Sequence, residues 1–74
     1  MYFYYNTSKG EVSIVKRAGR WHVVFQDQDL GSYLWAHQAA DDVSAGHTFT
    51  PPSGIDLGSL GIPGDLDRWS SKKP

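Results

Sequence analysis

The chain has 74 residues, with seven basic against eight acidic side chains, and a formal net charge of −1 at pH 7. A chain of this length forms a single domain, and its charge gives it no long-range attraction for nucleic acid, so such a role would need a local basic patch. It has no cysteine, which excludes disulfide bonds and thiolate metal sites and leaves the cytoplasm as the expected location.

Two extended segments open the chain. Residues 2–5 are all aromatic, which suits a strand, and residues 6–10 favour a turn. Residues 11–16 resume an extended pattern in which Val12 and Ile14 share one face, as the two-residue period of a strand requires. The sequence therefore predicts a first hairpin.

A second hairpin follows directly. Gly19 can take the positive φ of a tight turn without steric cost, and the strand after it places Trp21 and Phe25 on one face. The polar run 26–29 is unsuited to a buried strand and predicts the next turn, while residues 30–34 predict a short returning strand. Three or four antiparallel strands result.

The period of the apolar residues changes at about residue 36. Ala36, Ala39, Ala40 and Val43 fall at positions i, i+3, i+4 and i+7, which places small side chains along one stripe of a helix. Gly46 is suited to end this helix in the left-handed conformation. Because alanine is small, the helix can lie close against the predicted sheet.

The segment 47–69 is rich in Gly, Pro and Ser, yet it keeps more apolar side chains than a solvated linker usually carries. We expect an irregular strap packed on the sheet or helix, with a final helical turn started by Pro63 and Asp65. Residues 70–74 are predicted to be a flexible tail. The apolar residues of the strap are Phe49, Ile55, Leu57, Leu60, Ile62, Leu66 and Trp69.

Together these elements predict one α+β domain over residues 1–69, with a core of residues 1–46. A three- or four-stranded antiparallel meander packs on one helix, and the strap covers part of what remains. The sequence has neither the leading pattern of a signal peptide nor an apolar run long enough to span a membrane, so no membrane association is expected.

Aromatic side chains are the first candidates for a binding site, because ten of them are too many for so small a core. Tyr2, Tyr4, Trp35 and Trp69 are the candidate partner-binding residues. Trp35 stands where a helix start prefers Ser, Thr, Asp or Asn. Either the helix begins earlier, with Ser32 as its cap and Trp35 in the core, or Trp35 is an exposed anchor; the usual burial of large aromatics favours the first.

Basic residues give an alternative site. Lys16, Arg17 and Arg20 fall at the predicted second hairpin turn, with His22 close by, and such a cluster can hold phosphate groups. Lysine and arginine at strand ends are also ordinary protection against edge-to-edge pairing. Weak nucleic-acid binding through these four residues is therefore the alternative to protein binding.

Motifs for catalysis or metal binding are missing from the sequence. The three histidines lack metal-ligand spacing, and Asp27 and Asp29 begin like a calcium loop that the following residues do not complete. There is no GxSxG, no cysteine nucleophile and no glycine-rich phosphate loop that opens a helix. We expect a protein that is not an enzyme and that needs no metal or cofactor.

One family resemblance covers residues 21–46. This stretch resembles the strand and helix part of the ethylene-response-factor type DNA-binding domain and its relatives in phage integrases, which implies three antiparallel strands packed on one helix and a sheet that reads the major groove. At positions where those domains carry outward arginines and tryptophans, this chain has His22, Val24 and Gln26. The matching positions are Trp21, Leu30, Gly31, Tyr33, Ala39 and Ala40.

A second resemblance covers residues 12–33, 46–51 and 60–69, which are similar to small uncharacterised proteins of proteobacteria and their phages. It implies no particular activity. The leading functional hypothesis is therefore a non-catalytic protein-interaction module, which binds another protein or a second copy of itself through an open sheet face or an edge strand.

Overall fold

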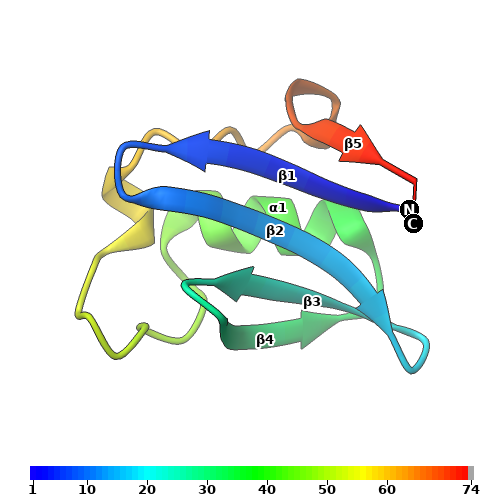
Figure 1. Cartoon of the computed structure of the whole chain (residues 1–74), viewed down its shortest axis with the longest axis horizontal. Coiled ribbons are helices and arrows are strands. Elements are labelled where there is room, and N and C mark those ends of the chain that lie inside the picture. The colour runs from blue at the N-terminus through cyan, green and yellow to red at the C-terminus, as the bar shows by residue number, and fades with distance from the viewer. Residues whose placement is uncertain (74) are drawn as a thin grey trace.

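A computed structural model describes residues 1–73 as one bent antiparallel sheet with a helix against its concave side (Figure 1). The sheet has the order β4-β3-β2-β1-β5, so it has five strands where the sequence predicted three or four. The α+β prediction is confirmed. The elements are β1 (Tyr2–Thr7), β2 (Gly10–Arg17), β3 (Arg20–Phe25), β4 (Gln28–Tyr33), α1 (Ala36–Ala45), the 3-10 turns η1 (Leu57–Ser59) and η2 (Leu66–Arg68), and β5 (Ser70–Lys72).

Two-residue turns join β2 to β3 and β3 to β4. Ala18 and Gly19 have φ of 51° and 79°, and Gln26 and Asp27 have φ of 53° and 61°. Two successive residues with positive φ match the right-handed twist of the flanking strands, which makes such turns the favoured hairpin connection. The predicted turn over residues 26–29 was therefore too long, because its last two residues belong to β4 and pair with β3.

The core lies between the concave face of the sheet and the predicted stripe of α1. Ala39, Ala40 and Val43 are fully buried, which confirms the stripe, and Gly46 ends the helix at φ 77°. Short side chains let the helix axis approach the strands, since a leucine at either alanine would hold it away. The sheet contributes the buried side chains of Val12, Ile14, Val23, Phe25 and Leu30.

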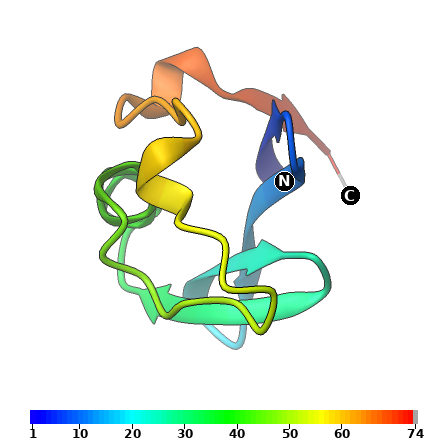
Figure 2. The same ribbon diagram turned by 90° about the vertical axis from the view of Figure 1, so that its left-hand side faces the viewer.

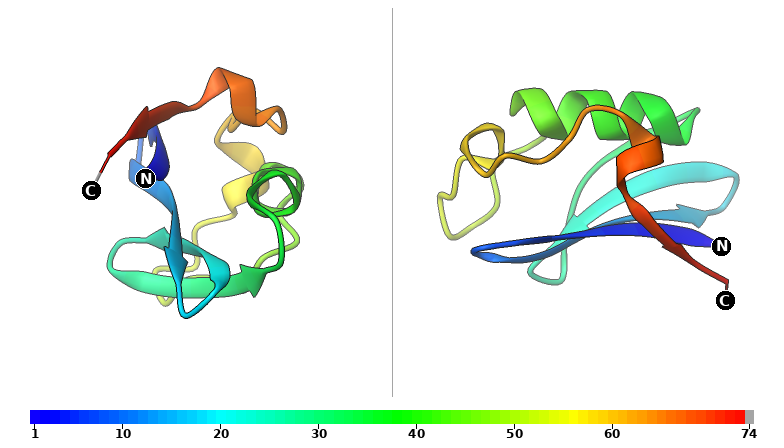
Figure 3. Two further views of the ribbon diagram at one scale, coloured as in Figure 1. Left: turned by 90° about the vertical axis from the view of Figure 1, so that its right-hand side faces the viewer. Right: turned by 90° about the horizontal axis from the view of Figure 1, so that it is seen from above.

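The strap wraps around the open side of this core, as Figures 2 and 3 show. Leu57, Ile62 and Trp69 are buried in the same cluster as the helix stripe. Asp56 and Asp65 cap η1 and η2 by accepting backbone hydrogen bonds, so the helical turn expected after Pro63 is present. The strap therefore completes the concave side of the molecule.

The predicted flexible tail is wrong for residues 70–72, which form β5. Tyr2 pairs with Lys72, and Tyr4 pairs with Ser70. Without β5, the first half of β1 would be an edge with unpaired backbone groups, which three added residues are enough to satisfy. Residue 74, the end of the predicted tail, lies outside the described residues. Within residues 1–73, no helix has the length and apolar character needed to cross a bilayer.

Candidate functional site

The convex face of the sheet, which points away from α1, carries six side chains that we call the outer face. Strand register places them in two rows across β1, β2 and β3. All six are partly exposed, and neither α1 nor the strap lies on this side (Figures 2 and 3). The outer face consists of Tyr2, Val15 and His22 in one row, and Tyr4, Ser13 and Val24 in the other.

Tyr2 and Tyr4 lie next to each other on β1, with ring centroids 6.0 Å apart and planes tilted by 46°. The Nζ of Lys72 sits 5.3 Å from the centroid of the Tyr4 ring, a distance at which a cation is attracted to the ring face. Because Phe3 and Tyr5 occupy the other phase of β1 and pack against the core, the two outer tyrosines are the ones left for contact with a partner.

A β-bulge brings residues of β4 onto the same side. His22 pairs with Ser32 and Val24 pairs with Asp29, so two β4 residues, Leu30 and Gly31, lie opposite the single residue between them on β3. In a regular strand, positions 29 and 32 would face opposite sides. The extra residue restores both to the outer side, and Gly31 takes the required φ of 142°, which other residues rarely adopt.

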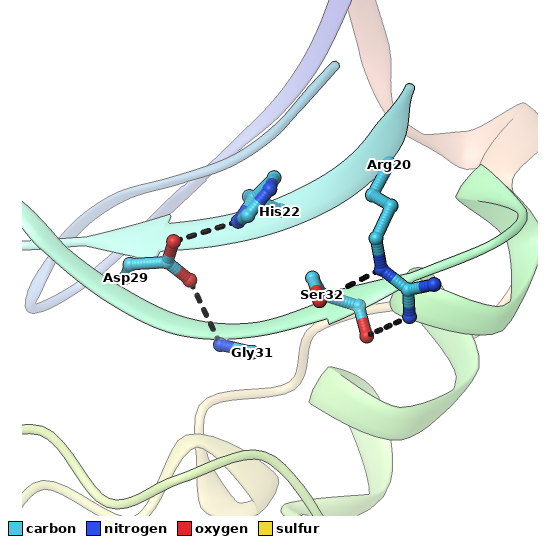
Figure 4. Close-up of polar contacts among 5 residues, drawn as sticks. All are labelled: Arg20, His22, Asp29, Gly31 and Ser32. Atoms are coloured by element: carbon cyan, nitrogen blue, oxygen red, sulfur yellow. Dashed lines mark hydrogen bonds and ion pairs between the residues drawn. The ribbon is translucent and has the colours of Figure 1, made fainter. Parts of the chain in front are cut away.

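The bulge allows two groups of polar contacts at the margin of the outer face, one around Asp29 and one around Ser32 (Figure 4). His22 Nδ1 lies 2.6 Å from Asp29 Oδ2, and Asp29 Oδ1 accepts a hydrogen bond of 3.0 Å from the Gly31 backbone N–H. Arg20 reaches across to β4, where its Nε donates to Ser32 Oγ at 3.0 Å and its Nη2 donates to the Ser32 carbonyl at 3.3 Å. These side chains fix the edge of the face.

Serine, histidine and aspartate thus come close together, but they do not form a hydrolytic triad. A triad needs the serine hydroxyl bonded to the histidine that takes its proton. Among residues 1–73, Ser32 Oγ is bonded to Arg20 and no hydrogen bond joins it to His22. The side chain of Asp29 is 46% exposed, whereas the triad aspartate is buried. The same part of the chain holds no group of three potential metal ligands.

Four cationic side chains of the strands collect at one end of the sheet, where β5 ends and the β2–β3 hairpin turns, and Lys73 directly follows β5. We call Lys16, Arg17, Arg20 and Lys72 the basic end; all four are exposed. Lys16 Nζ lies 5.8 Å from the ring centroid of Trp21. Of the four residues predicted for nucleic acid, Arg20 and His22 already have polar partners within the chain.

An open hollow lies at the same end of the sheet. It is bounded by side chains from β1, β2 and β3, most of them apolar or aromatic. Tyr2 and Val15 belong to the outer face. Lys16 and Trp21 lie in the other strand phase, which faces the core, so the hollow opens at the end of the sheet and only adjoins the outer face. Its lining residues are Met1, Tyr2, Val15, Lys16 and Trp21.

The two tryptophans predicted as anchors have opposite environments. Trp35 is 58% exposed and precedes α1 without a side-chain cap, so the favoured prediction of a buried Trp35 was wrong; Ser32 lies in β4 and does not cap the helix. Trp69 is 7% exposed, and its Nε1–H donates to the Pro63 carbonyl at 2.9 Å. Its ring packs against Tyr5, which removes Trp69 from the candidate anchors.

Sequence reasoning missed two residues that matter at this site, Asp29 and Ser32. Asp29 was assigned to the turn over residues 26–29, and Ser32 was considered only as a helix cap; the bulge places both on the outer side of β4. Gly31 was the available clue, because glycine inside a strand often marks a bulge. Phe49, which is 74% exposed beside β4, was expected to pack in the strap.

Comparison with protein-family models, with curated proteins and with solved structures gives no match for this chain. The two family resemblances found in the sequence therefore stay predictions.

Proposed function

We propose that this chain is a non-catalytic protein-interaction module whose docking surface is the outer face. The observation that carries the proposal is the uncovered convex side, on which Tyr2, Tyr4, Val15 and Val24 are partly exposed beside one another. When one face of an antiparallel sheet is in contact only with water, the residues on that face are usually polar. Tyrosine is among the residues enriched in binding hot spots.

The nucleic-acid alternative has less support from the same geometry. Two of its four predicted residues are engaged within the chain, and the chain as a whole carries a charge of −1. Phosphate contacts dominate the affinity of nucleic-acid binders, so a site with few available cations binds weakly. We also propose a cytoplasmic setting, because the chain has no cysteine that an oxidising compartment would pair.

A peptide-display selection tests the proposal. The folded protein is panned against a random peptide library, and enriched peptides are measured against wild type, Tyr4→Ser, Tyr2→Ser and the control Phe49→Ser. Phe49 is another exposed aromatic, but it lies beside β4, at the far edge of the sheet from β1. Loss of an aromatic hot-spot residue costs about 2 kcal/mol or more, so the tyrosine variants should bind at least about tenfold more weakly.

The control should bind like wild type. Amide shifts in an NMR titration should then map onto β1, β2 and β3 on the outer face. The proposal is wrong if no peptide is enriched, or if the enriched peptides lose affinity with Phe49→Ser and keep it with both tyrosine variants. An oligonucleotide that binds more tightly than every selected peptide would favour the alternative.

A further inference from the structure

Most ionic groups of the sheet are separated by sign toward its two ends, with Lys9 in the β1–β2 turn as the exception. Antiparallel register brings the end of β2, the start of β3 and the end of β5 to one end, which carries Lys16, Arg17, Arg20 and Lys72. The acidic residues of the strands and their turns, Glu11, Asp27 and Asp29, lie toward the other end, near the β1–β2 and β3–β4 turns. A chain with a net charge of −1 therefore has one locally basic end.

Within the described part of the chain, no carboxylate lies within ion-pair distance of the basic end. Among residues 1–73, the pair within ion-pair distance is His22 with Asp29, and none of the four cations takes part in one. Lys16 and Lys72 lie over the rings of Trp21 and Tyr4, 5.8 Å and 5.3 Å from the centroids. A ring face attracts the charge of an ammonium group but leaves its N–H donors able to bind an anion.

The hollow places apolar surface directly beside these cations. The side chains of Met1, Val15 and Trp21 present apolar surface whose burial by a ligand would be favourable, and Lys16 lines the same hollow. Burial of one aliphatic side chain supplies the apolar part of an affinity, and carboxylates set beside that side chain supply the charged part. The basic end and the hollow call for different chemistry in one ligand, and both lie at the same end of the sheet.

Resting on the proposed function, we infer that the partner presents an acidic segment whose carboxylates lie against the basic end and whose apolar side chain enters the hollow. A protein segment fits better than a nucleic acid because the lining of the hollow is mostly apolar or aromatic and the cations beside it are few. It also fits the overall charge, since short-range carboxylate contacts do not need a long-range field. The module thus selects partners by local sequence.

Labelled synthetic peptides test this inference by fluorescence anisotropy with the full chain. The probe is a short peptide of aspartate and glutamate around one central leucine. Three comparison probes replace the leucine by serine, replace every acidic residue by lysine, or replace the peptide by single-stranded oligothymidylate. We expect the acidic leucine peptide to bind most tightly and to lose affinity as salt rises, because the contacts are exposed.

Two variants and one control locate the contact. Arg17→Glu should weaken the acidic leucine peptide by about tenfold, because it replaces an attraction by a repulsion. Lys9→Glu makes the same change of charge at the other hairpin and should leave the affinity unchanged. Val15→Thr keeps the shape of the side chain but adds a hydroxyl to the hollow, so it should weaken the leucine peptide and spare the serine peptide.

Four results would overturn the inference: no binding of the acidic peptide, equal binding of the lysine peptide, equal effects of Arg17→Glu and Lys9→Glu, or tighter binding of oligothymidylate. The proposed function fails separately. If display selection gives neutral or basic peptides that depend on Tyr2 and Tyr4, the outer face is a docking surface and only the acidic partner is wrong. Analytical ultracentrifugation at several concentrations tests whether the chain associates with itself through Arg17. If it does, the basic end binds a second copy of the chain and not an acidic partner, and the inference also fails.

Discussion

Replacement of Trp69 tests whether this tryptophan stabilises the fold or serves as an anchor for a partner, because only a structural role changes the free energy of unfolding. The indole is 7% exposed, packs 6.0 Å from Tyr5 by ring centroids, and donates to the Pro63 carbonyl. Truncation of a buried tryptophan to alanine costs about 3–5 kcal/mol, and we expect the lower figure because the strap above it can partly close the gap. A domain of this size has a free energy of unfolding of about 4–11 kcal/mol, so Trp69→Ala should remove a large fraction of it.

Urea unfolding followed by far-ultraviolet circular dichroism measures this loss without relying on tryptophan fluorescence. With a slope of about 1–1.5 kcal/mol per molar urea, a loss of about 3 kcal/mol lowers the midpoint by about 2–3 M. Trp69→Phe keeps most of the packing and loses one hydrogen bond, so it should cost about 1–2 kcal/mol. The matched control is Trp35→Ala, which removes a tryptophan that is 58% exposed and should cost less than about 0.5 kcal/mol. Equal midpoints for the two alanine variants would refute the packing of the strap.

Three further predictions concern the backbone and one phenol. Gly46→Ala should destabilise the fold by at least about 1 kcal/mol more than Gly54→Ala, since both glycines have φ 77° but only at Gly46 would a Cβ lie within 3.2 Å of the η1 backbone; urea midpoints measure the difference. Gly31→Ala should cost about 1–3 kcal/mol and shift NMR signals at the bulge, because φ 142° is strained for alanine. Burial, a hydrogen bond to Asp42 and its charge raise the pKa of Tyr33 to about 12 from 10.0. The unfolded chain then loses this proton first, so stability falls as pH rises from 10 toward 12, and Tyr33→Phe should show a smaller fall in alkaline unfolding.

Regular periods explain the part of the fold that the sequence predicted well. Val12 and Ile14 alternate with outward residues, and their burial follows from that alternation alone. The change of period at residue 36 likewise placed Ala39 and Ala40 against the sheet before any tertiary contact was considered. Where one physical rule acts over several consecutive residues, the sequence is sufficient.

Elements set by a single residue or by a distant partner were predicted less well. The bulge depends on Gly31, and it moves Asp29 and Ser32 to the outer side against the simple period. Strand β5 depends on the free edge of β1, almost the whole chain away, so the composition of residues 70–72 gave no indication of it. The burial of Trp69 needs the strap to return to Tyr5, which local pattern does not encode.

The candidate site consists of strand residues that do not face the core and of the cations at the end of the sheet. The first four positions of β1, residues 2–5, are all aromatic, and β-propensity alone would account for tyrosine on a half-exposed strand. That explanation does not extend to the cations, because Lys16 and Lys72 rest on aromatic rings where a carboxylate on the neighbouring strand would neutralise them more fully. A surface that needed only solubility would intersperse both signs of charge along the sheet. Separation of the signs, next to an apolar hollow, is what a directional docking surface requires, since it gives a bound segment one favourable orientation.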